Sequence, residues 1–168
     1  MDAGRLSPDT HTAADVVRLL RLQPLELEGG YFRRTAVSGD VLPGGTRRAW
    51  SAIHALFTPD GFSAMHRLAG DEIWCFQAGD PLESLRLRAE GGGEWVKLGL
   101  DPAANERPQD VVPARVWQGT RLVPGGRWAL VSCVVVPEFV WTDFTLAGRE
   151  ALTAAYPAWT AEIRALTR

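Results

Sequence analysis

Between residues 29 and 136 the sequence repeats one pattern, a short apolar or alternating run followed by a cluster of turn residues. Many short strands separated by regular turns are typical of an antiparallel sandwich or a closed barrel. No long helical pattern interrupts these runs, which disfavours a parallel α/β sheet. We therefore predict a mostly β fold with strands at residues 49–57, 63–68, 72–77, 82–88, 95–98, 110–112, 116–122 and 128–136.

Helical patterns flank this region on both sides. Thr12 and Asp15 fit a capping box at the start of a helix over residues 12–22, and Pro24 is expected to end that helix. Two more helices are predicted at residues 146–155 and 158–166. Since no repeat or linker is visible, we expect one domain over residues 1–168, with a barrel core at about 25–145 and a helical tail at 146–168.

The charge and composition disfavour several classes of function. Lys and Arg are scattered and the formal net charge is −2, so no nucleic-acid partner is expected. No apolar run approaches the roughly 18 residues of a membrane span, and the first residues lack the order of a signal peptide. Cys75 and Cys133 lack the spacing of a disulfide framework or a zinc site. We expect a cytoplasmic protein without a membrane partner.

The most informative stretch carries a histidine and a glutamate on neighbouring predicted strands. His66 precedes a tight turn at Gly70 and Asp71, and the next strand begins at Glu72. Side chains alternate between the two faces of a strand, so Glu72, Trp74 and Phe76 share one face, as Ala64, His66 and Leu68 do on the other strand. If these faces point into a barrel, His66 and Glu72 form the minimum of a metal site or of an acid–base pair.

Several segments in order give the chain a resemblance to a known family. The segments are Glu28 to Arg33, Ser51 to Ile53, His66-Arg67, Asp71 to Trp74, Ala78 to Leu82, Pro108-Gln109, Val112 to Ala114, Trp117, and Asp143-Phe144 with Leu146. In this order they resemble the cupins, and within them the family called cupin 5 or DUF985. The resemblance implies a double-stranded β-helix barrel, or jelly roll, that binds a small molecule or a metal inside and forms a homodimer.

The sequence departs from the cupin pattern at the positions that usually bind metal. The resemblance implies three histidines and one glutamate, but Ala64 stands at one histidine position and Gln118 at another. Since a carboxamide binds transition metals far less well than an imidazole, we expect no metal cofactor. If a divalent metal binds, its expected ligands are His66, Glu72 and Gln118.

His54 is a further candidate for the site. It shares a strand face with Trp50, Ala52 and Leu56, and it adds a second titratable group to the cavity if that face points inward. The alternative is a histidine bonded to a backbone carbonyl at the rim of the barrel. Candidate catalytic residues are therefore His66, Glu72 and His54, and candidate substrate-binding residues are Glu28, Tyr31, Arg33, Trp50, Trp74, Phe76, Gln109, Trp117 and Gln118.

Three functions are compatible with these residues. The first is a metal-independent isomerase, epimerase, lyase or cyclase that acts on a sugar-like or secondary-metabolite intermediate by acid–base chemistry, with His66 as base and Glu72 as acid. The second is a metal-dependent oxygenase, which requires His54 and His66 to converge. The third is a binding protein without turnover. The aromatic residues favour a ring-shaped or polyketide-like ligand if they line a pocket, although core packing explains them equally well.

Overall fold

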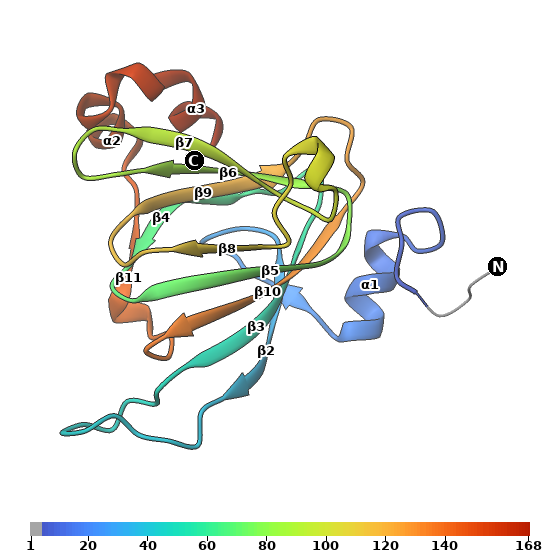
Figure 1. Cartoon of the computed structure of the whole chain (residues 1–168), viewed down its shortest axis with the longest axis horizontal. Helices are drawn as coiled ribbons and strands as arrows, with labels where there is room; N and C mark the ends of the chain where they lie inside the picture. The colour runs from blue at the N-terminus through green and yellow to red at the C-terminus, as the bar shows by residue number, and fades with distance from the viewer. Residues whose placement is uncertain (1–4) are drawn as a thin grey trace.

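A computed structural model describes residues 5–168, and its strands form two antiparallel sheets that face each other (Figure 1). The six-stranded sheet consists, in order, of β1 (Gln23–Pro24), β2 (Tyr31–Val37), β3 (Ser51–Phe57), β10 (Ala129–Val136), β5 (Asp71–Gly79) and β8 (Gln109–Val112). The five-stranded sheet consists of β11 (Phe144–Leu146), β4 (Ser63–Leu68), β9 (Trp117–Leu122), β6 (Leu82–Leu87) and β7 (Gly93–Leu98). This confirms the predicted mostly β cupin architecture with helices before and after the strands.

The predicted strands are found with small shifts at their ends, and three strands were not predicted. The alternation of β5 is clear, because Glu72, Trp74 and Phe76 are buried while the residues between them are more exposed. The segment that forms β2 contains two adjacent arginines, so it lacks an apolar alternation. The strands β1 and β11 have two and three residues, which is too short for a periodic signal.

The helix α1 (Ala13–Leu20) lies against the outer face of the six-stranded sheet (Figure 1). Thr12 caps it and forms the predicted capping box with Asp15. The prediction that Pro24 ends this helix is wrong, because Arg21 already takes a left-handed conformation at φ 53° and closes the helix. Its apolar face buries Val16 in a cluster with Leu56, Trp128 and Leu130.

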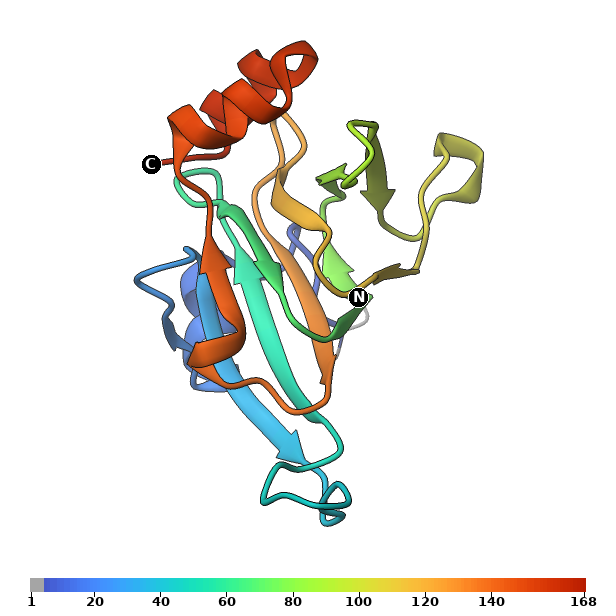
Figure 2. The same ribbon diagram turned by 90° about the vertical axis from the view of Figure 1, so that its left-hand side faces the viewer.

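The C-terminal helices α2 (Arg149–Ala155) and α3 (Thr160–Ala165) cover the outer face of the five-stranded sheet (Figures 1 and 2). Their buried residues Leu152 and Ile163 pack in a cluster with Met65 and Leu85. Gly119 of β9 leaves room for this cluster, since a Cβ there would lie 2.5 Å from the sulfur of Met65 on β4 and 3.3 Å from Cβ of Leu166 after α3. Short 3₁₀ turns lie at Pro102–Ala104, Trp141–Asp143 and Pro157–Trp159.

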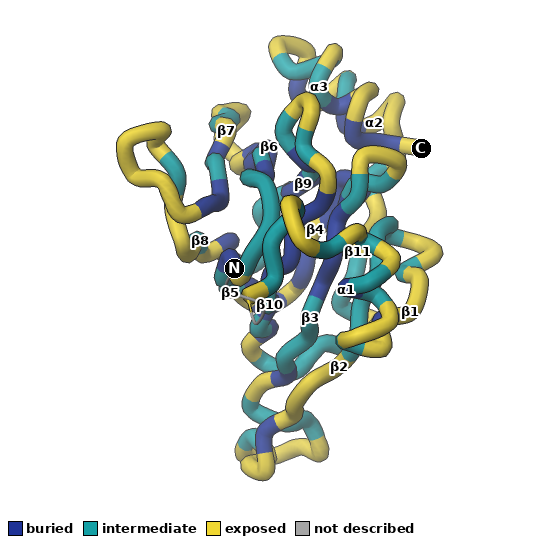
Figure 3. Tube along the Cα trace, turned by 90° about the vertical axis from the view of Figure 1, so that its right-hand side faces the viewer, coloured by how far each residue is buried: buried dark blue, intermediate teal, exposed yellow. Residues whose placement is uncertain are grey.

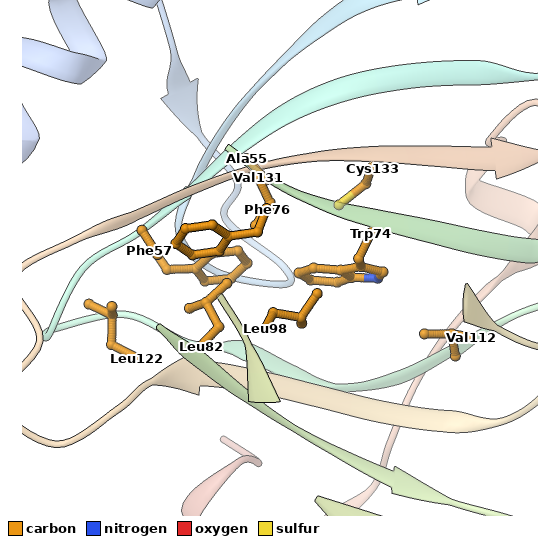
Figure 4. Close-up of a cluster of buried hydrophobic side chains, with 11 residues drawn as sticks. Ala55, Phe57, Trp74, Phe76, Leu82, Leu98, Val112, Leu122, Val131 and Cys133 are labelled. Carbon is orange, nitrogen blue, oxygen red and sulfur yellow. The ribbon is translucent and has the colours of Figure 1, made fainter. Parts of the chain in front are cut away.

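The space between the sheets is filled at one end and hollow at the other. The strands contain most of the buried residues, while the loops are largely exposed (Figure 3). Phe57 and Trp74 stack at the filled end with their ring centroids 5.8 Å apart, and Phe76, Leu82 and Leu98 pack around them (Figure 4).

Within residues 5–168, no helix has the length and apolarity needed to cross a membrane.

Candidate functional site

A largely enclosed cavity of about 70 Å³ lies between the two sheets, next to the packed cluster of Figure 4. Most of its wall is apolar, and Phe57 and Trp74 separate it from the filled end of the core. The segment between β10 and β11 contributes Phe139 and Trp141 to the wall of the cavity. Trp141 is exposed, so this side of the cavity borders solvent. Five titratable side chains also line this mainly apolar space: Glu28, Arg34, His66, Glu72 and Cys133.

His66 lies in the middle of β4 with its imidazole held in one orientation. Its Nδ1 atom is 2.8 Å from the carbonyl oxygen of Ala64, and since a carbonyl only accepts, Nδ1 carries a proton. The ring stacks on Phe144 with centroids 5.0 Å apart, and only 2% of the residue is exposed. The Nε2 atom is therefore the ring nitrogen left free to exchange a proton with a ligand.

Glu28 reaches the cavity from the loop that precedes β2. Its Oε1 atom accepts a hydrogen bond from Ser63 at 2.5 Å and lies 4.0 Å from Nε2 of His66. Gly29 makes this approach possible, because its φ is +113° and a Cβ there would lie 2.1 Å from the carbonyl oxygen of Phe62. The backbone of Ala64 also donates to the carbonyl oxygen of Glu28 at 2.8 Å, which ties the loop to β4.

Glu72 is the buried acid of the cavity. Burial raises the pKa of its carboxyl group, the charge of His66 opposes that rise, and the charge of Glu28 adds to it. Its Oε2 atom accepts a hydrogen bond of 2.6 Å from Nε2 of Gln118 on β9. A carboxyl group with a raised pKa in an apolar site is suited to donate a proton.

Trp74 places an unused hydrogen-bond donor in the wall of the cavity. Its indole Nε1 is buried, makes no hydrogen bond of ordinary geometry within residues 5–168, and lies near enough to Glu72 to lower the pKa of that carboxyl group. In Figure 4 this nitrogen lies at the end of the ring that is remote from Phe57. A buried donor without a partner is costly, so an oxygen of a bound molecule is a suitable partner for it.

The residues at the cupin metal positions do not fit a metal centre. The Oε1 atom of Gln118 accepts a hydrogen bond from Arg86 at 3.3 Å and its amide nitrogen donates to Glu72, so its oxygen faces a cation, which disfavours a metal ion at the same place. Ala64 has no donor atom in its side chain. Within residues 5–168, no three His, Cys, Asp or Glu side chains are grouped in a way that would hold a metal ion.

His54 and His66 do not share one cavity. On β3 the residues Ser51, Ile53 and Phe57 line the cavity, so His54 lies on the opposite face, which is the outer side of the six-stranded sheet. There its Nδ1 atom is 3.2 Å from the hydroxyl of Ser132, and it is paired across strands with Arg33. Burial, with a smaller contribution from Arg33, lowers the pKa of His54. The convergence that the oxygenase hypothesis requires is therefore absent.

The other candidate residues divide between the cavity and the rest of the molecule. Glu28 and Trp74 line the cavity, and Gln118 lies behind it in contact with Glu72. Six others lie elsewhere, so the expectation that Tyr31, Phe76 and Trp117 line the cavity is wrong. Tyr31 packs with the α1 cluster, Phe76 belongs to the filled core, and Trp117 packs with the α2–α3 cluster under Arg67. Trp50 is exposed, Arg33 pairs with His54, and Gln109 donates to Cys75 on the outer face. The aromatic residues that do line the cavity are Trp74 with Phe32, Phe57, Phe139 and Trp141.

Sequence reasoning missed several residues that shape the site. Phe144 supports the ring of His66, and it comes from a three-residue strand whose position no local pattern indicates. Arg86 is only 3% exposed although it is an arginine in a run of leucines, and that unusual composition was a signal available in the sequence. Phe139 and Trp141 reach the cavity from an irregular segment.

Comparisons with known proteins agree with the fold. The chain aligns with a protein from Shewanella oneidensis (TM-score 0.88, 37% identity, 94% of this chain and 98% of that one). A hypothetical protein from Leishmania major gives a TM-score of 0.84 at 30% identity, over 94% of this chain and 99% of that one. A Bacillus subtilis oxalate decarboxylase gives a TM-score of 0.56 at 13% identity, over 86% of this chain and 37% of that one, so it shares the fold alone.

Among the curated proteins, none matches the chain. The family described as "Cupin superfamily (DUF985)" matches residues 14–147, which include every residue that we have placed in the cavity. Over this range, the two antiparallel sheets agree with the fold that the resemblance in the sequence implies. The chain therefore belongs to the DUF985 family of the cupin superfamily.

Proposed function

We propose that this protein is an enzyme that moves protons within a small carbonyl compound, as an isomerase, epimerase or lyase does. The observation that carries the proposal is that one enclosed cavity holds a free imidazole Nε2 and a buried carboxyl group of raised pKa. Such a reaction needs one group that accepts a proton and one that donates a proton. Their environments must give the two groups different pKa values.

The geometry supports a division of roles between the two residues. Nε2 of His66 takes a proton from the carbon next to the carbonyl, and the electrons of that C–H bond form a C=C bond. The carbonyl electrons move to the oxygen, which receives a proton from Glu72, so that an enol results. When the deprotonated carbon also carries a hydroxyl group, this enol is an enediol. Return of the proton from His66 to the former carbonyl carbon, with loss of the proton of the other hydroxyl group to Glu72, completes an isomerisation. Return of a proton to the opposite face of the first carbon, with the enol proton going back to Glu72, completes an epimerisation.

Glu28 and Trp74 assist this transfer in different ways. When His66 takes up a proton it becomes a cation, and the Glu28 carboxylate 4.0 Å from Nε2 stabilises that charge. The unpartnered indole N–H of Trp74 supplies a hydrogen bond to an oxygen of the substrate. Both contacts are stronger in this mainly apolar cavity than they would be in water.

The size of the cavity sets the size of the reacting group. A water molecule needs about 10–15 Å³ of such space, so about 70 Å³ accommodates roughly five or six non-hydrogen atoms. This size suits a short hydroxy- or keto-compound, or one end of a longer molecule that enters past Trp141. A complete sugar ring or polyketide skeleton is larger than the enclosed space.

Solvent isotope exchange tests this proposal without knowledge of the net reaction. Keto- and hydroxy-compounds of three to five carbons are incubated with the protein in D₂O, and loss of their C–H signals is followed by proton NMR. We expect exchange on at least one compound with the native protein, no exchange with His66→Gln or Glu72→Gln, and native exchange with His54→Gln on the outer face. Binding of a compound without exchange in the native protein would favour a binding protein over an enzyme.

A further inference from the structure

A chain of four polar side chains, three of them buried, runs from the partly exposed Asp110 on β8 to Glu72 in the cavity. Arg86 on β6 donates from Nη2 to Asp110 at 3.1 Å and from Nη1 to Oε1 of Gln118 at 3.3 Å. Gln118 then donates from Nε2 to Oε2 of Glu72 at 2.6 Å. The exposed fractions of Arg86, Gln118 and Glu72 are 3%, 1% and 6%, so water does not compete for these bonds.

The direction of every bond in this chain follows from Arg86. A guanidinium group has donors and no acceptor, so the Gln118 atom that faces it must be the amide oxygen. The amide nitrogen therefore faces Glu72, and it can only donate. Since two donors cannot face each other, the proton of a neutral Glu72 cannot lie on Oε2, and it lies on Oε1.

We infer that Gln118 is a positioning residue: its amide, oriented by the Arg86–Asp110 pair, keeps Oε2 of Glu72 as an acceptor and leaves Oε1 to present the acidic proton to the ligand. This inference rests on the proposed function, because it specifies which oxygen of Glu72 acts as the acid. It assigns to Gln118 a role unlike that of a metal ligand or a group that contacts substrate.

The Arg86–Asp110 pair has a separate consequence for the charge of the site. Asp110 faces Arg86 directly, so the buried cation already has a counter-ion and does not need an ionised Glu72. The other titratable or charged groups around the cavity are His66 on β4, Glu28 on the loop before β2, Arg34 on β2, and the buried thiol of Cys133 on β10. Glu72 can therefore stay neutral although Arg86 lies behind Gln118, the residue that donates a hydrogen bond to Glu72.

Infrared spectroscopy of the Glu72 carboxyl group tests the inference without a known substrate. The C=O band of the protonated carboxyl is identified by its loss in Glu72→Gln and is then followed against pH. In Gln118→Met, which keeps the length of the side chain without its donor, we expect the band at higher frequency because its oxygen has lost a hydrogen bond. We also expect the pKa of Glu72 to rise by about one to two pH units, as the carboxylate loses the same bond.

Thr167→Val is the control, since Thr167 is also buried and its hydroxyl bonds to Arg149 and to the carbonyl oxygen of Ile163, outside the chain from Asp110 to Glu72. It should leave both the band and the pKa of Glu72 at their native values. Gln118→Leu replaces Gln118→Met if circular dichroism shows that the latter is unfolded.

The outcomes separate the two claims. A native band that titrates above the ordinary range of a glutamate and shifts in Gln118→Met supports both of them. A native band that titrates in the same high range but does not shift in Gln118→Met overturns the role of Gln118 and leaves the proposed function in place. A Glu72 that titrates as an ordinary glutamate in the native protein overturns the proposed function and this inference together.

Discussion

Two contacts of His66 point in opposite directions: Nδ1 lies 2.8 Å from the carbonyl oxygen of Ala64, and Nε2 lies 4.0 Å from Oε1 of Glu28. The first contact requires a proton on Nδ1. The second contact keeps the Glu28 carboxylate near Nε2, the nitrogen that can exchange a proton with a ligand in the cavity. A neutral His66 is therefore held in the Nδ1–H tautomer, with its lone pair on Nε2.

Nitrogen NMR tests this tautomer directly. The protein has three histidines, so the signals of His66 are assigned by their loss in His66→Gln. At a pH where His66 is neutral, we expect Nδ1 to resonate as a protonated nitrogen and Nε2 as an unprotonated one. The reverse assignment would mean that Nε2 cannot act as a base, and it would remove the first step of the proposed reaction.

Glu72→Gln is expected to stabilise the protein near neutral pH. Burial raises the pKa of this carboxyl above its ordinary value of 4.5, so the folded state holds its proton more tightly than the unfolded chain does. The free energy of unfolding then falls as the pH rises from the ordinary value through the folded value, where the carboxyl must ionise in place. A glutamine keeps the acceptor for Gln118 and avoids that cost.

The measurement is urea unfolding of the native protein and of Glu72→Gln between pH 4 and pH 8. We expect equal stability at the acid end and an advantage for the variant of about 0.5–2 kcal/mol at the alkaline end, the usual size for one stabilising substitution. A variant that is less stable at every pH would show that the carboxyl group supports the fold, and Glu72 would then be a structural residue.

The sequence predicted the fold and the centre of the site for one physical reason. Side chains alternate along a strand, so the shared face of Glu72, Trp74 and Phe76 follows from their spacing, and the structure places all three inside. Alternation does not say which face of a strand points inward. For β3 the inward face belongs to Ser51, Ile53 and Phe57, and His54 therefore lies outside.

Contacts that depend on the pairing of distant strands were out of reach of the sequence. Gln118 reaches Glu72 across 46 positions and Arg86 reaches Gln118 across 32, and no local pattern encodes either bond. The support that Phe144 gives to His66 depends on the pairing of β11 with β4, where Phe144 lies opposite Leu68. These contacts determine the environment of the His66 ring and the position of the proton on Glu72, so the roles of the two residues could be specified only from the structure.

His54→Gln is expected to make the protein less sensitive to acid. Burial lowers the pKa of His54, and Arg33 adds to this, so the unfolded chain binds this proton more tightly than the folded protein does. The contribution of His54 to stability is therefore lost as the pH falls from about 6.5 through the lower folded value. The effect should stay below about 1 kcal/mol, because the ring is only partly buried.

The check is the difference in unfolding free energy between pH 7 and pH 5, measured for the native protein and for His54→Gln. A smaller loss in the variant is expected, and His66→Gln serves for comparison because its ring lies in the cavity. If His54→Gln loses as much stability as the native protein does, then His54 titrates normally and its position on the outer face does not affect its charge.

Gly29→Ala is expected to damage both the fold and the site, because Gly29 is the residue that brings Glu28 into the cavity. A Cβ at this position would lie 2.1 Å from the carbonyl oxygen of Phe62, and the φ of +113° is unfavourable for any residue with a side chain. We expect a loss of stability of about 2–4 kcal/mol, which combines backbone strain with a steric overlap that needs movement of the main chain. The control is Gly44→Ala, where φ is +77° and no atom lies within 4 Å of the added Cβ, so only the strain of about 1–2 kcal/mol remains.

Urea unfolding of the two variants, together with the histidine NMR signals of each, separates the two contributions to the loss of stability. Gly29→Ala should also shift the signal of Nε2 of His66 as Glu28 moves away, while Gly44→Ala should leave that signal unchanged. Equal losses in the two variants, with an unchanged His66 signal in both, would mean that the loop adapts and that Gly29 does not position Glu28.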